Sequence, residues 1–275
     1  MPYRTAPYYI LVVIAVILAG FWPSYFSQGA DVPWQFHAHG VAASIWVLMV
    51  LVQSMTIHKG QLPIHRAVGK SSLLLFPFLI GGLAAIIDLT AKGYIAADSP
   101  FRVEFGGQFL VGLALAIAAY VVLYYRALKF RRKVWLHSGY MLATPLILFE
   151  SPFSRLMTGF VPGLTIRGPE NFDRIIPSIE WAMAIELAII AVLWLRFRDK
   201  ASPFLVAGIF IVGQMLTMGL LADNALLEWL LTVIGRMPSA AVVLTGFAIG
   251  AATSWAGWNA GKRPAVPAGV APQPA

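Results

Sequence analysis

Long apolar segments alternate with short polar connections along the whole chain. Eight of these segments are about as long as the roughly 20 helical residues that cross a hydrocarbon core of about 30 Å. They lie near residues 7–26, 36–57, 68–90, 105–126, 138–158, 179–196, 202–222 and 239–258. None shows the apolar and polar alternation of a membrane barrel strand. The pattern predicts an all-α, polytopic membrane bundle of eight transmembrane helices, forming a single domain over residues 1–260.

Two segments depart from this pattern. Residues 224–236 (NALLEWLLTVIGR) carry a leucine-rich stripe, but as a helix they rise only about 20 Å, which is too short to span. We expect an amphipathic helix that lies in the membrane interface. The alternative is an extension of the seventh span, 202–222. The end of the chain, residues 261–275, is rich in proline and alanine and is predicted to be a disordered tail.

The composition supports a membrane protein and excludes several kinds of chemistry. Hydrophobic residues make up 59% of the chain and charged residues only 12%, which is about half the charged fraction of a soluble domain. The chain has no cysteine, so disulfides, thiolate metal sites, iron–sulfur clusters and cysteine nucleophiles are excluded. The sequence contains no phosphate-binding loop, dinucleotide fingerprint or metalloprotease motif.

The net charge of +8 is distributed unevenly between alternate connections. Fourteen of the twenty lysines and arginines fall on one side of an eight-span bundle, together with both termini. Because these residues are enriched on the cytoplasmic side of membrane proteins, we expect both termini in the cytoplasm and the protein in a bacterial inner membrane. The distribution indicates membrane lipids as partners, and not nucleic acid.

Polar side chains gather in the outer halves of several predicted spans, where an ionisable group is costly and is therefore a functional candidate. His39, Glu150 and Glu186 offer imidazole and carboxylate ligands for Zn, Fe or Mn, or the groups of a proton relay. Glu186 is the deepest and is expected to keep its proton at neutral pH, because burial disfavours the charged form. The other polar candidates within the spans are Trp46, Gln53, Asp88, Gln108 and Gln214.

Several of these acidic groups also have a purely structural interpretation. Asp88, Glu104 and Glu180 lie near span ends, where interfacial water would reach them. Glu150 would pair with Arg155, about one helical turn further along. In this interpretation they mark no site.

The second span carries a regular polar stripe. His39, Trp46 and Gln53 repeat every seven residues and therefore share one helical face. His37 is two residues from His39, so the two imidazoles lie on different sides of the helix. The stripe predicts either a packed seam between helices or a functional site.

Three histidines lie on the basic side of the predicted bundle. Histidines on two helices at equal depth are what a b-type haem needs as axial ligands, with nearby arginines for its propionates. His65 or His58 would pair with His137, and Arg66 is the adjacent cation. The same groups fit a quinone headgroup. The structural alternative is that this basic side binds anionic lipid headgroups.

An ordered set of motifs resembles a bacterial family of multi-pass membrane proteins of unknown function. The motifs are HG (39–40), Trp46, Gln53, HRAVG (65–69) and H-x-x-x-M (137–141), and the GFWPSYF stretch of the first span is similar as well. The resemblance covers roughly residues 15–155. It implies functional roles for His39, Trp46, Gln53, His65, Arg66 and His137, while His58 matches no position of the family. A weaker similarity to b-type membrane cytochromes rests on the histidines at span ends.

Three hypotheses about function follow. The first is a redox-linked protein that binds haem, quinone or a divalent metal through His39, His65 and His137. The second is a small-solute or proton transporter, with Glu186 and Gln214 lining the path. The third is a non-enzymatic subunit or assembly factor of a larger membrane complex, in which other subunits are partners and the polar groups serve helix packing.

Overall fold

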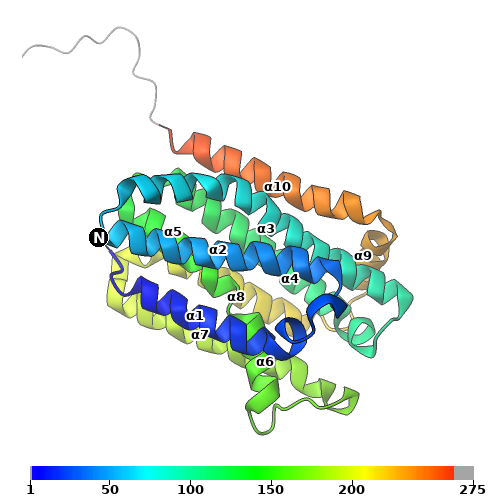
Figure 1. Ribbon diagram of the computed structural model, residues 1–275. Helices are drawn as coiled ribbons and strands as arrows, with labels where there is room; N and C mark the ends of the chain where they lie inside the picture. Colours follow the sequence, from blue (N-terminus) through cyan, green and yellow to red (C-terminus); the bar gives the residue numbers. More distant parts are fainter. Residues whose placement is uncertain (1, 263–275) are drawn as a thin grey trace, which may run out of the picture.

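The computed structural model describes residues 2–262, apart from the side chain of Ala30, and the regular structure of this part is entirely helical (Figure 1). The all-α prediction is confirmed, whereas the predicted tail lies outside the described residues from position 263 onward. The α-helices are α1 (Ala6–Phe21), α2 (Trp34–His58), α3 (Leu62–Ala96), α4 (Pro100–Lys129), α5 (Val134–Ile147), α6 (Glu150–Phe160), α7 (Ile175–Phe197), α8 (Ser202–Leu220), α9 (Ala225–Arg236) and α10 (Ser239–Ala260). A π-helical turn, η1 (Trp22–Phe26), extends α1, and the 3₁₀ turns are η2 (Gly29–Asp31), η3 (Pro169–Arg174) and η4 (Arg198–Lys200).

Seven helical segments within residues 2–262 are long and apolar enough to cross a membrane. They are α1 with η1, α2, α3, α4, α7 with its flanking 3₁₀ turns, α8 and α10. Each corresponds to one predicted span. This arrangement fits an integral, multi-pass membrane protein.

The remaining predicted span, 138–158, is not a single helix. It is divided between α5 and α6, which have 14 and 11 residues and rise about 21 Å and 17 Å. Neither helix alone crosses a hydrocarbon core of about 30 Å. Seven of the eight predicted segments are therefore single helices of membrane-spanning length, whereas the eighth, 138–158, is not.

Two prolines explain why the helix breaks there. Pro145 and Pro152 have no N–H group, so each removes one hydrogen bond to the carbonyl four residues earlier. α5 instead closes with tighter bonds, from the N–H of Leu148 to the carbonyl of Pro145 (3.3 Å) and from that of Phe149 to Leu146 (2.9 Å). Leu148 and Phe149 keep right-handed helical dihedral angles, so the break is a kink rather than a loop.

The segment after α8 forms a separate helix and is not an extension of the seventh span. α8 ends at Leu220, and the backbone turns at Asp223, which has a φ of 53°. The side chain of Asn224 then caps α9 by accepting a hydrogen bond from the N–H of Leu226 (3.0 Å). The fully buried Leu231 packs α9 against α3 and α4. The helix exists as predicted, and its position at the membrane surface stays a prediction.

α10 lies closely against α3 at two glycines. A Cβ atom on Gly250 would stand 2.6 Å from the Cα atom of Pro77, and one on Gly246 would stand 2.5 Å from the Cβ atom of Ala84. No side chain fits at these distances, so only glycine permits this helix–helix distance.

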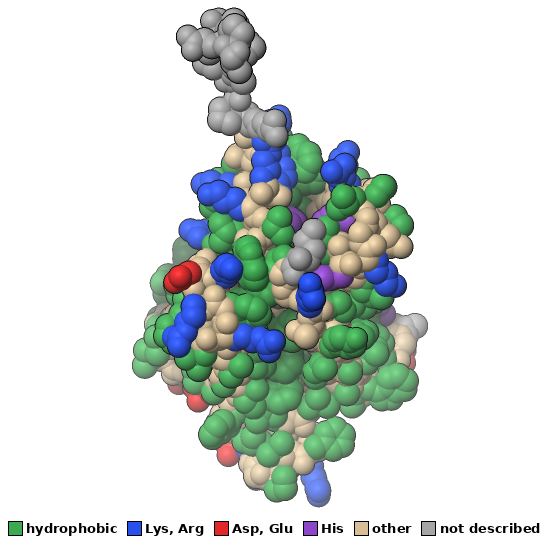
Figure 2. Space-filling model, turned by 90° about the vertical axis from the view of Figure 1, so that its left-hand side faces the viewer, with side chains coloured by type: hydrophobic (Ala, Val, Ile, Leu, Met, Phe, Trp, Pro, Cys, Tyr) green, Lys and Arg blue, Asp and Glu red, His purple; other side chains and the backbone are tan. Residues whose placement is uncertain are grey.

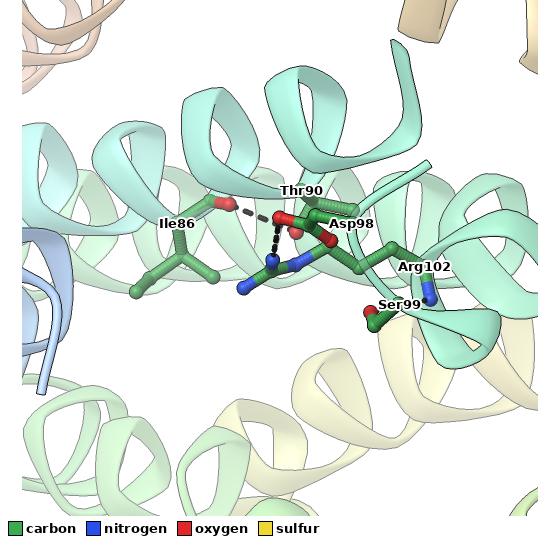
Figure 3. A network of polar contacts seen from close by, with 5 residues as sticks. All are labelled: Ile86, Thr90, Asp98, Ser99 and Arg102. Carbon is green, nitrogen blue, oxygen red and sulfur yellow. Dashed lines mark hydrogen bonds and ion pairs between the residues drawn. The ribbon is translucent and has the colours of Figure 1, made fainter. Parts of the chain in front are cut away.

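A compact polar turn joins α3 to α4. The hydroxyl group of Ser99 caps α4 by accepting a hydrogen bond from the N–H of Arg102 (3.4 Å). The guanidinium group of Arg102 pairs with the carboxylate of Asp98, beside Thr90 in the last turns of α3 (Figure 3). Thr90 itself bonds back to the carbonyl of Ile86 (2.9 Å). These local contacts fix the direction in which α4 leaves α3.

The long helices run side by side, and the start of α1 and the end of α10 lie at the same end of the bundle (Figure 1). The α2–α3, α4–α5 and α7–α8 connections lie there as well. Figure 2 looks onto this end and shows the gathering of lysine and arginine side chains. We call it the basic end, and its cations are Arg4, Lys59, Arg66, Lys70, Arg126, Lys129, Arg131, Arg132, Lys133, Arg196, Arg198, Lys200 and Lys262.

Candidate functional site

The polar stripe of α2 points into the bundle. Trp46 is fully buried, and the side-chain amide of Gln53 donates a 2.9 Å hydrogen bond to the carbonyl of His65. The Oε1 atom of Gln53 and the Nδ1 atom of His39 are buried, and neither has a hydrogen-bond partner among the described residues. The predicted common face of His39, Trp46 and Gln53 is therefore confirmed, and both ends of the stripe carry unsatisfied polar atoms.

Two glutamates lie near each other at the break between α5 and α6. Glu186, in the middle of α7, is 1% exposed, and it lies close enough to Glu150, the first residue of α6, to interact electrostatically with it. The Oε1 atom of Glu186 is buried without a hydrogen-bond partner in the described part of the chain. Since α7 begins at Ile175, Glu186 lies about 16 Å from the end of its helix. The positive end of the α6 dipole favours a carboxyl group at this position.

Two tyrosines complete this group. Tyr9 of α1 and Tyr120 of α4 lie close enough to Glu186 to interact electrostatically with it. The hydroxyl group of Tyr120 donates a 3.0 Å hydrogen bond to the carbonyl of Thr144, whereas that of Tyr9 is buried and has no partner among residues 2–262. We call Tyr9, Tyr120, Glu150 and Glu186 the carboxyl cluster. It draws one residue from each of α1, α4, α6 and α7.

Glu150 does not form the predicted ion pair with Arg155. The ion pairs of the described residues join Asp88 to Lys92 and Asp98 to Arg102. The Nη1 atom of Arg155 instead donates to the carbonyl (2.8 Å) and hydroxyl (2.7 Å) oxygens of Ser151. Its guanidinium group lies over the ring of Phe21, 4.8 Å from the centroid. The guanidinium group of Arg155 is near enough to Glu150 to interact electrostatically with it, but the two groups are not within ion-pair distance.

A cavity of about 160 Å³ opens beside the first turn of α6, between α1 with η1, α2 and α6. We call it the outer cavity, because it lies toward the end opposite the basic end. Four aromatic side chains, Phe21, Tyr25, Phe26 and Phe36, form part of its walls. Its polar lining residues are Ser24, His39, Ser44, Ser151 and Arg155, in addition to Tyr25. The π-helical turn η1 supplies several of these side chains, and such turns are frequent at functional sites.

His37 and His39 take different positions around this cavity, as their spacing predicted. His39 lies on its wall. His37 points toward η1, where its Nδ1 atom and the hydroxyl group of Tyr25 share a 3.0 Å hydrogen bond. That bond fixes the ring of Tyr25 in the cavity wall.

The predicted metal site of His39, Glu150 and Glu186 is not formed. Within the described residues, no three His, Asp or Glu side chains are arranged to hold a metal ion. The physical reason is helix packing, because α2 lies along α3 while α7 packs against α6 and α8. His39 therefore lies on the cavity wall and is not grouped with Glu150 and Glu186.

Asp88 corrects another expectation. It is fully buried rather than wetted, and it forms an ion pair with Lys92, one helical turn further along α3. The Nζ atom of Lys92 also donates a 3.0 Å hydrogen bond to the carbonyl of Met237, after the end of α9. The pair therefore fastens α9 to the end of α3. Glu104, in contrast, is exposed and Glu180 is half-buried, in line with the structural interpretation.

The two glutamines of the spans connect α4 to α8. Gln108 donates a 2.8 Å hydrogen bond to the carbonyl of Met218, and Gln214 donates one of 2.9 Å to the carbonyl of Gly112. Both amides are engaged in helix packing, so the structure gives no support to Gln214 as a path-lining residue.

Two of the three basic-end histidines come together. His65 of α3 and His137 of α5 are close enough to interact electrostatically. The Nδ1 atom of His65 lies 3.3 Å from the carbonyl of Gln53, and that of His137 lies 2.9 Å from the carbonyl of Ala127. Donation from Nδ1 leaves the Nε2 lone pair available as a ligand or hydrogen-bond acceptor. We call these residues the inner histidine pair.

His58 does not fit the role of an axial ligand. Its Nδ1 atom lies 2.6 Å from the carbonyl of Ser54, and its Nε2 atom lies 3.2 Å from the carbonyl of Pro2. Both ring nitrogens are therefore engaged with backbone oxygens. Arg66, the predicted neighbouring cation, is exposed at the basic end, near His65 in the first turns of α3.

Tyr9, Tyr120 and the outer cavity were not identified from the sequence. Tyrosine is an ordinary residue of apolar spans, so neither ring carries a signal of its own. Pro145 and Pro152 did carry a sequence signal, because two prolines seven residues apart interrupt a helix at the position of Glu150.

Comparisons with protein-family models, curated proteins and solved structures find no significant match, so the resemblance to a membrane-protein family rests on the motifs alone.

Proposed function

We propose that the chain crosses a bacterial inner membrane eight times, with α5 and α6 together forming one broken crossing. Both termini are then cytoplasmic and α9 lies at the outer membrane surface. The support is the placement of successive connections at alternate ends of the bundle and the gathering of cations at the basic end (Figure 2). Cations on the cytoplasmic side are the expected arrangement.

We further propose that the protein is a proton-linked transporter of a small solute. The single observation that carries this proposal is the burial of Glu186 in the middle of α7, which packs against α6, the helix that begins with Glu150 at the break. Discontinuous helices near the membrane midplane are the usual place for substrate and ion sites in secondary transporters. In this chain the helix is broken between α5 and α6, Glu150 and Glu186 lie near the break, and a cavity opens beside it.

The chemistry of the carboxyl cluster suits the binding and release of one proton. Two neighbouring carboxylates, of which Glu186 is buried and Glu150 half-buried, cannot both be charged without an electrostatic cost. One proton on the cluster relieves that cost, and the dipole of α6 stabilises the single remaining negative charge. The buried Tyr9 hydroxyl is available as a hydrogen-bond donor to that charge.

Uptake into proteoliposomes tests this proposal. The vesicles contain a pH-sensitive dye and are given an inward proton gradient, and a panel of labelled carboxylates, amines, amino acids and sugars is supplied. We expect accumulation of one solute class together with protons. The variant Glu186→Gln should lose it, and Glu104→Gln should keep it, because Glu104 is an exposed glutamate away from the cluster. Uptake by Glu186→Gln at the rate of the unaltered protein would contradict the proposal.

The inner histidine pair favours a second candidate function, electron transfer through a b-type haem. The donor set fits, because both Nδ1 atoms bond to backbone carbonyls and both Nε2 atoms are directed elsewhere. His65 and His137 would hold the iron, Arg66 would be the nearby cation for a propionate, and the haem would supply one-electron transfer. The visible spectrum of detergent-purified protein tests this. A Soret band that His137→Ala abolishes supports haem, and a colourless protein excludes it.

A further inference from the structure

We propose that the outer cavity binds a small monocarboxylate with a compact apolar body, of the size of benzoate. This names a substrate class for the proposed transporter and rests on that proposed function for its physiological role. The binding itself rests on the geometry of the cavity alone. Its size, its aromatic walls and two polar groups lead to this class.

The size and the walls of the cavity select the apolar part of the ligand. An apolar protein cavity of about 150 Å³ accepts a benzene ring, and the outer cavity has about 160 Å³. Phe21, Phe26 and Phe36 lie around it and offer ring faces and edges. A single six-membered ring or a branched aliphatic body fills this volume, whereas a fused ring system exceeds it.

Arg155 selects the charge of the ligand. Arg155 lines the cavity and is also exposed, so this residue lies at the rim. It forms no ion pair in the described part of the chain, since its polar partner is the neutral Ser151. Arginine binds a carboxylate with two parallel hydrogen bonds, so a monocarboxylate matches this rim.

His39 is a second polar residue in the wall of the same cavity. Its ring lies on the wall, and its buried Nδ1 atom has no hydrogen-bond partner among residues 2–262. A buried polar atom without a partner costs free energy, which a ligand can recover by making the missing bond. The hydroxyl groups of Ser24 and Ser44 line the same space.

The position of Arg155 also links the ligand to the proton. Arg155 follows Glu150 by five residues on α6, which is a rise of about 7 Å. An anion held by Arg155 disfavours negative charge on the neighbouring carboxyl cluster and therefore favours its protonation. Solute anion and proton are then held together, so that the loaded protein gains no net charge.

Equilibrium dialysis of the purified full-length protein in detergent against labelled benzoate tests the inference. Benzamide is the matched control ligand, because it has the same ring and shape without the charge. We expect saturable binding of benzoate, and binding of benzamide weaker by about 10- to 100-fold, the factor that corresponds to loss of a charged hydrogen bond. Equal affinity for the two ligands, or no binding of benzoate, would overturn the proposal.

Variants locate the binding. Arg155→Gln should weaken benzoate binding by about 10- to 100-fold, and Arg155→Lys should recover part of the loss. Arg167→Gln is the matched control, because Arg167 is an exposed arginine that does not line the cavity. Size-exclusion chromatography and circular dichroism establish that each variant is folded. A folded Arg155→Gln protein that binds benzoate normally would place the ligand elsewhere and overturn the assignment.

The results separate this inference from the proposed function. Benzoate binding that depends on Arg155, without proton-driven uptake in vesicles, supports the cavity assignment and contradicts transport. Proton-driven uptake of another solute, without any binding of benzoate, supports transport and overturns the substrate class.

Discussion

The indole Nε1–H of Trp46 donates a 2.9 Å hydrogen bond to the hydroxyl oxygen of Thr144, which joins α2 to α5 just before the kink. That hydroxyl in turn donates to the carbonyl of Met141 (2.8 Å), the group that Pro145 deprives of its helical partner. The carbonyl of Thr144 accepts from the hydroxyl of Tyr120. The buried tryptophan is therefore part of the network that satisfies the broken helix.

Replacing Trp46 tests this network. Trp46→Phe keeps an aromatic ring but loses the Nε1–H donor, so we expect a loss of about 1–3 kcal/mol in stability, measured by thermal unfolding in detergent. Trp255→Phe is the control, because Trp255 is 72% exposed and should be nearly neutral. Equal melting temperatures for the two variants would show that the hydrogen bond contributes little.

The approach of α1 to α6 provides a second prediction. A Cβ atom on Gly20 would stand 2.0 Å from the carbonyl oxygen of Pro152, so Gly20→Ala must separate the two backbones. We expect a destabilisation of about 1–3 kcal/mol together with a change in the outer cavity, seen as weaker benzoate binding. Gly159→Ala, on α6 itself, is the control, since nothing lies within 4 Å of its added methyl group. A melting temperature of Gly20→Ala as high as that of Gly159→Ala would contradict this close packing.

The proton on the carboxyl cluster is open to direct observation. A protonated carboxyl group has an infrared carbonyl stretch that a carboxylate lacks, and we expect this band in the folded protein at neutral pH. Glu186→Gln or Glu150→Gln should remove or shift it, while Glu104→Gln should leave it unchanged. If the band is missing, the cluster does not hold a proton and the proposed coupling fails.

The topology can be checked with reporter fusions at two points. A fusion after residue 130, in the α4–α5 connection, should report the cytoplasm, and one after residue 165, between α6 and α7, should report the outside. Location of both on the same side would mean that α5 and α6 do not cross the membrane together. The eight-crossing topology would then be replaced by seven.

Hydropathy was sufficient to predict the helices, but not which side chains they bury against one another. Seven apolar segments became membrane-length helices because their length and composition leave no other way to satisfy the backbone in lipid. Asp88 shows the limit, since distance from a span end predicted wetting, whereas a neighbouring lysine and the packing of α9 bury it. Sequence spacing does not reveal which helices become neighbours.

The candidate site shows the same limit. The stripe of His39, Trp46 and Gln53 could be predicted, because it depends on the periodicity of one helix. The meeting of Glu150 with Glu186 depends on the packing of α6 against α7, and the metal site that the sequence suggested failed for the same reason. A kink at Glu150 was predictable from its two flanking prolines.

The kink between α5 and α6 has a mechanical consequence. Because Leu148 and Phe149 keep helical dihedral angles, a small rotation about them is enough to swing α6, with no loop to be rebuilt. The outer cavity has one wall on α2 and another on α6, and Glu150 begins the same helix. A hinge at this point would widen or narrow the cavity and change the separation of the two glutamates in one movement, so that admission of a solute and release of a proton share a single pivot.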